Sequence, residues 1–247
     1  MDELRESGAG AASAPWAQPR FLVAAVGVAL LAVLAFVLAV SGPSDPDAPE
    51  PAAARPGAPP AEPATGPDAS VCGLEEGAQE VPAAAPARTR WELVGTMAAP
   101  TAPDVHGPGV VEDGYRSCFA RSPLGALYAA VSFWALGTAK PSADVMERLA
   151  ARTAERARAI RDAATAGQEP ALDRSTTLQV AGFRFVAYEA DTAIVDLAVR
   201  VANGGVASLP TTLRWEGGDW KYVVPANGDP GVREIPDLAG YAAWTGA

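Results

Sequence analysis

The sequence predicts an α+β domain that is carried on a single membrane-spanning helix. An unbroken apolar run comes first, at residues 21–40. Apolar side chains then recur at helical spacing between residues 122 and 166, and they alternate with polar ones between residues 174 and 225. Helices followed by an alternating antiparallel sheet are typical of the α+β class.

The apolar run Phe21–Val40 predicts a transmembrane helix. It holds no charged or polar side chain, and 20 residues at about 1.5 Å each match the thickness of a bilayer core. Arg5 and Arg20 precede the run, whereas the first basic residue after it is Arg55, so residues 1–20 are expected in the cytoplasm. The alternative is a cleaved signal peptide, whose apolar region is usually shorter, about 7–15 residues. Both interpretations place the C-terminal domain outside the cytoplasm.

Residues 41–69 predict a disordered spacer. Nine prolines fall in this segment, together with many Ala, Gly, Asp and Glu residues, so it cannot bury enough apolar surface to fold. The remaining chain, 70–247, is long enough for one extracytoplasmic domain. The net charge of −10 argues against direct binding to nucleic acid, which needs clustered basic charge.

The two cysteines, Cys72 and Cys118, predict a disulfide, because the domain is expected in an oxidising compartment. A loop of this size is stabilised by about 4 kcal/mol in the chain-entropy model. A pair of buried free thiols is the alternative, with a reactive thiol as a weaker one.

Two helical regions are expected within residues 122–166. Ser122-Pro123 is a helix start, with Ser as the N-cap, and Gly137 is a natural residue to follow the helix end. A second region begins near Ser142. Several arginines lie mostly away from its apolar positions, and they are either solvated or a docking face for an acidic partner or lipid head group; the candidates for that face are Arg148, Arg152 and Arg156.

Four strands are expected in the sheet, at residues 176–188, 193–201, 207–215 and 220–224, because apolar and polar side chains alternate and turn residues separate them. This pattern predicts a curved four-stranded antiparallel meander with the helices in its concave face, the cone of the nuclear-transport-factor-2-like superfamily. Residues 70–121 are expected to be an irregular extension, and 226–247 a C-terminal tail.

The sequence offers no catalytic, cofactor or metal site. The only histidine, His106, lies in a Gly/Pro-rich loop and is expected at the surface; a nucleophilic pair with Cys118 would conflict with the disulfide. One His and two Cys are too few for a typical zinc site, and there is no phosphate-binding glycine motif. Asp191, Asp196 and Asp219 are interpreted as turn-forming or solvated residues.

Several segments resemble a family of actinobacterial single-pass membrane proteins that are associated with integrative and conjugative elements. They are Ser70–Leu74, Trp91–Pro100, Gly107–Gly109, Gly114–Ala120 and Leu213–Pro225. By architecture the family is similar to the TcpC-like bitopic scaffold proteins of conjugation and type IV secretion, which have a nuclear-transport-factor-2-like domain. The resemblance implies a scaffold function and transfers no catalytic residue.

We therefore expect a non-enzymatic scaffold of a conjugative DNA-transfer apparatus, anchored in the cell membrane. Its expected partners are other membrane and channel proteins and the lipid bilayer, through Phe21–Val40, with self-association as a further expectation. An anchored ligand-binding domain is the alternative, in which sheet aromatics would line a pocket: Phe183, Phe185, Tyr188, Trp215, Trp220 and Tyr222. A hydrolase or isomerase is a third and weaker hypothesis.

Overall fold

The computed structural model describes residues 69–167, 172 and 177–245. The predicted anchor, residues 21–40, and almost all of the predicted spacer lie outside this part of the chain. Within it, no helix is long and apolar enough to cross a bilayer. The predictions of an anchor and a spacer therefore stay predictions.

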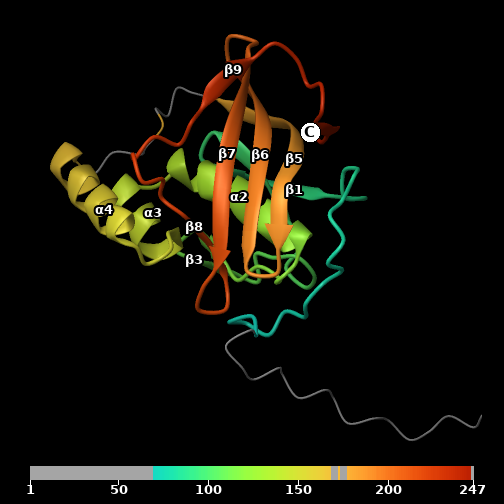
Figure 1. The fold of residues 1–247 in the computed structure, drawn as a ribbon, viewed down its shortest axis with the longest axis horizontal. Coiled ribbons are helices and arrows are strands. Elements are labelled where there is room, and N and C mark those ends of the chain that lie inside the picture. The colour runs from blue at the N-terminus through green and yellow to red at the C-terminus, as the bar shows by residue number, and fades with distance from the viewer. Residues whose placement is uncertain (1–68, 168–171, 173–176, 246–247) are drawn as a thin grey trace, which may run out of the picture. The chain divides into compact units, whose positions relative to one another are not determined.

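The predicted antiparallel meander is confirmed. Its strands follow one another in space as they do in the sequence (Figure 1): β5 (Leu178–Glu189), β6 (Thr192–Val201), β7 (Val206–Trp215) and β8 (Trp220–Tyr222). The expected alternation is clearest in β7, where Leu209, Thr211, Leu213 and Trp215 are buried and the residues between them are half-buried. Two irregularities in the pairing of β5 with β6 accompany the curvature of the sheet.

The sheet is larger than predicted, and the prediction of an irregular segment at 70–121 was wrong for residues 90–117. Four strands lie there: β1 (Arg90–Val94), β2 (Met97–Thr101), β3 (Val110–Glu112) and β4 (Tyr115–Ser117). The β1–β2 hairpin joins the main sheet because β2 pairs with β5 in parallel. The β3–β4 hairpin forms a separate two-stranded sheet.

The C-terminal tail also contributes strands. Strand β9 (Arg233–Ile235) pairs with β7, and β10 (Ala242–Ala243) pairs with β5. Among the described residues the main sheet therefore has eight strands. The segment 226–247, expected only as a C-terminal tail, therefore pairs with two strands of the meander.

Helix α2 (Pro123–Gly137) begins as predicted. The Ser122 hydroxyl accepts a hydrogen bond from the Gly125 amide at 3.1 Å and so caps the first turn. The helix end differs from the prediction: Gly137 is the last helical residue, and Thr138 is the cap in a right-handed conformation. The Thr138 hydroxyl donates to Ala135 O at 2.7 Å, so no left-handed glycine is needed.

The second helical region is broken into two helices, α3 (Ser142–Leu149) and α4 (Ala154–Ala166). Ala150 is extended, and the neighbouring Ala151 amide donates to Tyr222 O on β8 at 2.8 Å. Thr153 then caps α4, because its hydroxyl accepts from the Arg156 amide. Apolar residues continue at helical spacing through this region, but the hydrogen bond to β8 and the Thr153 cap divide it into two helices.

Helix α2 is the centre of the hydrophobic core. All its residues except Leu124 are buried, because the curled sheet covers one side and α3 and the β4 region cover others (Figure 1). Helix α4, in contrast, has no buried residue and packs mainly on α3 at the margin of the domain. The described chain is thus a mixed α+β domain with a curled sheet and three helices.

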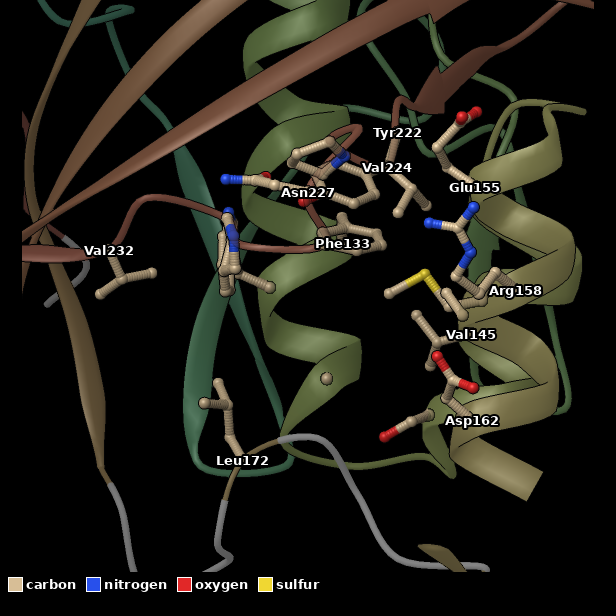
Figure 2. A pocket seen from close by; sticks show the side chains of 18 residues that line it. Phe133, Val145, Glu155, Arg158, Asp162, Leu172, Tyr222, Val224, Asn227 and Val232 are labelled. Carbon is tan, nitrogen blue, oxygen red and sulfur yellow. The ribbon is translucent and has the colours of Figure 1, made fainter. Parts of the chain in front are cut away.

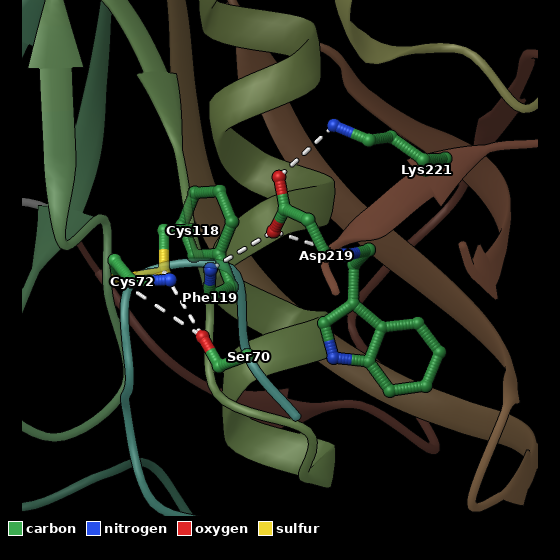
Figure 3. The surroundings of a disulfide bond; sticks show 7 residues. Ser70, Cys72, Cys118, Phe119, Asp219 and Lys221 are labelled. Atoms are coloured by element: carbon green, nitrogen blue, oxygen red, sulfur yellow. Dashed lines mark hydrogen bonds and ion pairs between the residues drawn. A yellow bond between two sulfur atoms is a disulfide. The ribbon is translucent and has the colours of Figure 1, made fainter. Parts of the chain in front are cut away.

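Two aspartates that were predicted to be solvated or turn-forming are buried, each 2% exposed. Asp219 accepts hydrogen bonds from the Phe119 and Trp220 amides and forms an ion pair with Lys221 (Figure 3). Asp196 accepts from Arg184, Ser208 and Tyr241 and so ties the C-terminal tail to the sheet. That interpretation was wrong for both, because each also has a partner that lies far away in the sequence, Phe119 for Asp219 and Tyr241 for Asp196.

Candidate functional site

A cavity of about 610 Å³ opens between α3, α4 and the chain segment that follows β8 (Figure 2). Side chains from α2, α3, α4 and β8, together with Leu172 and residues of the 224–232 segment, form its walls. They are Phe133, Trp134, Gly137, Ser142, Val145, Met146, Glu155, Arg158, Ala159, Asp162, Leu172, Tyr222, Val224, Pro225, Asn227, Gly228, Pro230 and Val232.

The floor of the cavity is apolar and well ordered by packing. Phe133 projects from α2 and stacks on Tyr222 of β8, with ring centroids 4.0 Å apart and planes at 19°. Val145 of α3 and Val224 extend the floor, and both are more than nine-tenths buried. The Trp134 indole is fixed to β7, because its Nε1 donates to the Thr211 hydroxyl at 2.8 Å.

The hydroxyl of Tyr222 is a polar atom on this apolar floor. The residue is 4% exposed, and burial raises the pKa of its phenol to about 12. Within the described residues no partner hydrogen-bonds to this hydroxyl, and its oxygen is not fully enclosed. Because Tyr222 lines the cavity, an occupant would lie against its side chain.

Helix α4 supplies the charged wall. Glu155, Arg158 and Asp162 recur at spacings of three and four residues, so they share one face of the helix. Figure 2 shows the guanidinium of Arg158 reaching from α4 toward Phe133 and Val224. Across the described residues, this guanidinium has no hydrogen bond and no ion pair within 4.0 Å.

The position of α4 is fixed at its N-terminal end. The Arg156 guanidinium donates to the carbonyl oxygens of Met146 and Glu147 at 3.0 and 2.5 Å, and so caps the C-terminal end of α3. This contact ties the N-terminal end of α4 to the C-terminal end of α3, and the cavity lies beside these two helices. Arg156 therefore shapes the site without lining it.

The three arginines of the predicted docking face do not form one surface feature. The Arg148 guanidinium lies 4.3 Å from the centre of the Tyr115 ring, and Arg156 is engaged with α3. Arg152 is exposed, and its amide donates to the Glu216 carboxylate. Their role as an interaction face stays a prediction. The arginine that faces the cavity is Arg158, which shares its helix face with Ala159 and Asp162.

The predicted aromatic pocket inside the sheet is not open. Phe183, Trp215 and Trp220 are core residues that are 0–8% exposed, and Phe185 and Tyr188 are half-buried beside them. Of the six aromatics only Tyr222 lines the cavity. The concave side of the sheet is filled by α2, so the cavity lies at the margin of the fold, where α4 leaves the core.

The predicted disulfide is present, with the Cα atoms of Cys72 and Cys118 6.0 Å apart (Figure 3). His106 differs from the prediction of a surface residue. It is half-buried with its ring edge toward Tyr128, and its Nδ1 is enclosed with no partner in the part of the chain that is described. Burial lowers the pKa of His106. The described residues contain no cluster of three or more His, Cys, Asp or Glu that could hold a metal ion.

Comparison with known proteins identifies a family but no characterised relative. No curated protein matches the chain, and no solved structure matches it. A family model described as a domain of unknown function (DUF8175) matches residues 50–243, which include the sheet, the three helices and every residue of the cavity. The chain therefore belongs to this DUF8175 family.

Proposed function

We propose that this protein is a membrane-anchored, non-enzymatic scaffold whose extracytoplasmic domain works by binding, as an assembly component of a conjugative DNA-transfer apparatus. The observation that carries the binding role is the open cavity beside α4. It exposes an apolar surface at the margin of the domain, beside the buried side chains of the core.

The shape of the domain supports contact from outside. Because α2 fills the concave side of the sheet, a partner would bind at the surface of the domain and not inside the curve of the sheet. The cavity beside α4 has an apolar floor and charged residues at its wall, as binding sites for protein side chains commonly do. The curled sheet around α2 also supports assignment to the nuclear-transport-factor-2-like cone, which is the fold of the scaffold proteins that the sequence resembles.

The sequence supports the placement of this domain. The apolar run Phe21–Val40 would fix the protein in the membrane, and the proline-rich segment 41–69 would hold the domain at a distance from it. Cytoplasmic residues 1–20 and an extracytoplasmic domain with one disulfide fit a single-pass protein of the cell membrane. The expected partners are channel proteins of the same assembly.

Site-specific photocrosslinking in donor cells tests this proposal. A photoreactive phenylalanine at Val232, at the edge of the cavity, is expected to crosslink a membrane protein of the transfer apparatus. The same residue at Val186, 61% exposed on β5 and outside the cavity, is the matched control. Deletion of the gene is expected to reduce transfer frequency. Unchanged transfer after deletion, with no channel protein crosslinked from Val232, would overturn the proposal.

A ligand-binding domain is the second candidate, and the size of the cavity favours it. A volume of about 610 Å³ falls within the range of about 300–1,000 Å³ that is usual for small-molecule sites. Within the described residues Arg158 has no ion pair and the Tyr222 hydroxyl has no hydrogen bond, so both are polar groups that a ligand could engage. Both functions are compatible with an anchored domain, since a ligand in the cavity would alter the surface that a partner meets.

A further inference from the structure

We infer that the cavity beside α4 binds a small amphiphile with an apolar body and a single anionic group. The apolar body would lie on the floor formed by Phe133 and Tyr222, and the anionic group would pair with Arg158. This inference rests on the proposed binding role of the cavity and names the chemistry of its occupant. It does not depend on which apparatus the protein serves.

The requirement for an apolar body follows from the floor. Phe133, Val145 and Val224 have less than a tenth of their surface exposed, and together with Met146 they present only carbon and sulfur atoms to the cavity. An occupant that covers apolar surface of this kind removes it from water, which favours binding. A wholly polar ligand would gain nothing there and would lose its hydration.

The requirement for an anionic group follows from Arg158. Among the described residues that line the cavity it is the only cationic side chain, and within that part of the chain its guanidinium has no ion pair to give up when an anion arrives. A guanidinium forms two parallel hydrogen bonds with a carboxylate, which is the strongest contact this wall can offer.

The two carboxylates near Arg158 limit the charge of the occupant. Glu155 lies three residues before Arg158 and Asp162 four residues after it. Neither carboxylate forms an ion pair with the Arg158 guanidinium. A ligand with several negative charges would be repelled by these side chains, whereas a single compact anion can reach the guanidinium. Glu155 also stabilises α4, because it occupies the first turn of the helix.

Tyr222 supplies a third contact. Its hydroxyl can donate a hydrogen bond at neutral pH, as any tyrosine hydroxyl can, and burial, which raises the pKa of the phenol to about 12, extends this to alkaline pH. Tyr222 is 4% exposed, so a hydrogen bond between its hydroxyl and an occupant of the cavity would meet little competition from water. An oxygen atom on the ligand body is therefore favoured over a purely hydrocarbon body.

Three matched small probes test the inference on the full-length protein in lipid nanodiscs. They are 4-phenylbutyrate, which is anionic, 4-phenylbutyramide, which is neutral, and 4-phenylbutylamine, which is cationic. All three share the phenyl ring and the carbon chain. Binding is measured by ligand-observed NMR titration, and the signal from empty nanodiscs is subtracted. The anionic probe is expected to bind about tenfold more tightly than the amide, a ratio that corresponds to about 1.4 kcal/mol.

The variants assign that preference to the cavity. Arg158→Gln is expected to remove the tenfold advantage of the acid while the amide binds as before, whereas Arg161→Gln, on the same helix but outside the cavity, should keep it. Ala159→Trp would occupy the cavity and is expected to abolish binding of both probes. Melting curves of each variant check that the fold is retained.

Three results would overturn the inference: no saturable binding beyond empty nanodiscs, a preference for the acid that survives Arg158→Gln, or tighter binding of the amine than of the acid. If probe binding fails while Val232 still crosslinks a channel protein, the ligand inference is refuted and the scaffold proposal stands. If the probes bind as expected but no channel protein is captured and transfer is unchanged, the scaffold proposal is refuted alone.

Discussion

Replacement of Asp219 by alanine is expected to destabilise the domain strongly. The carboxylate is 2% exposed and holds three donors: the Phe119 amide at 2.9 Å, the Trp220 amide at 3.0 Å and Lys221 Nζ at 3.1 Å. Hydrogen bonds to a charged group contribute about 1.5–3 kcal/mol each, and loss of one partner of a buried ion pair costs about 3–5 kcal/mol. Lys221 retains 19% side-chain exposure and can turn to water, so a loss of about 3–4 kcal/mol is expected from the buried amides and the ion pair together.

Two further variants separate the causes of that loss. Asp219→Asn keeps an acceptor oxygen for the two amides but removes the ion pair with Lys221, so it is expected to cost about 1–2 kcal/mol. Asp191→Ala is the matched control, because Asp191 is an exposed aspartate in a turn and its loss is expected to change stability by less than about 0.5 kcal/mol.

The assay is unfolding of the full-length protein in guanidinium chloride, followed by tryptophan fluorescence. Trp220 is a suitable reporter, because it lies next to Asp219 and its Nε1 donates to Ala120 O at 2.9 Å. The expected order of stability is wild type and Asp191→Ala together, then Asp219→Asn, then Asp219→Ala. The reasoning is refuted if Asp219→Ala is as stable as Asp191→Ala.

Three other perturbations have signs fixed by the structure. Reduction of the Cys72–Cys118 disulfide is expected to lower the free energy of unfolding by about 4 kcal/mol, because the disulfide closes a loop with a sequence separation of 46. Unfolding with and without reductant measures this difference. Gly125→Ala should destabilise by about 1–3 kcal/mol despite its better helix propensity, because a Cβ would lie 1.9 Å from Ala120 O; a raised melting temperature would contradict this. Burial lowers the pKa of His106 from 6.5, so the unfolded chain binds more protons below that pH, and stability should fall as the pH drops from 7 through 6. His106→Gln should flatten that slope, and an identical slope in both proteins would rule the mechanism out.

The parts of the fold that the sequence predicts are those that local patterns determine. Ser122 and Pro123 specify the start of α2 because the cap bond spans only three residues. Alternation of apolar and polar side chains specifies β7, whose two faces meet different surroundings. These signals need no knowledge of the rest of the chain.

The strands that the sequence missed depend on distant partners. Strand β2 contains Pro100 and two alanines, which have low strand propensity, yet it is held between β1 and β5. Strand β9 has only three residues and gains its conformation from β7. In both cases tertiary pairing overrides a weak local preference.

The buried aspartates show the same limit for polar residues. Asp219 accepts from the Phe119 amide 100 residues away, and Asp196 accepts from the Tyr241 hydroxyl 45 residues away. In the sequence each resembles an ordinary aspartate of a turn or an outer sheet face. Only the return of these distant segments explains why a charged side chain is buried without a large penalty.

The candidate site could not be predicted because it is assembled from α2, α3, α4, β8 and the segment after β8. Its location also has an energetic consequence. Helix α4 contributes no buried residue, so substitutions on it should have little effect on the global stability of the domain. Phe133 and Tyr222, by contrast, belong to the core, and their loss would combine effects on binding and folding. Arg158 is therefore the position at which the two effects separate, because a change in affinity there cannot be attributed to loss of the fold.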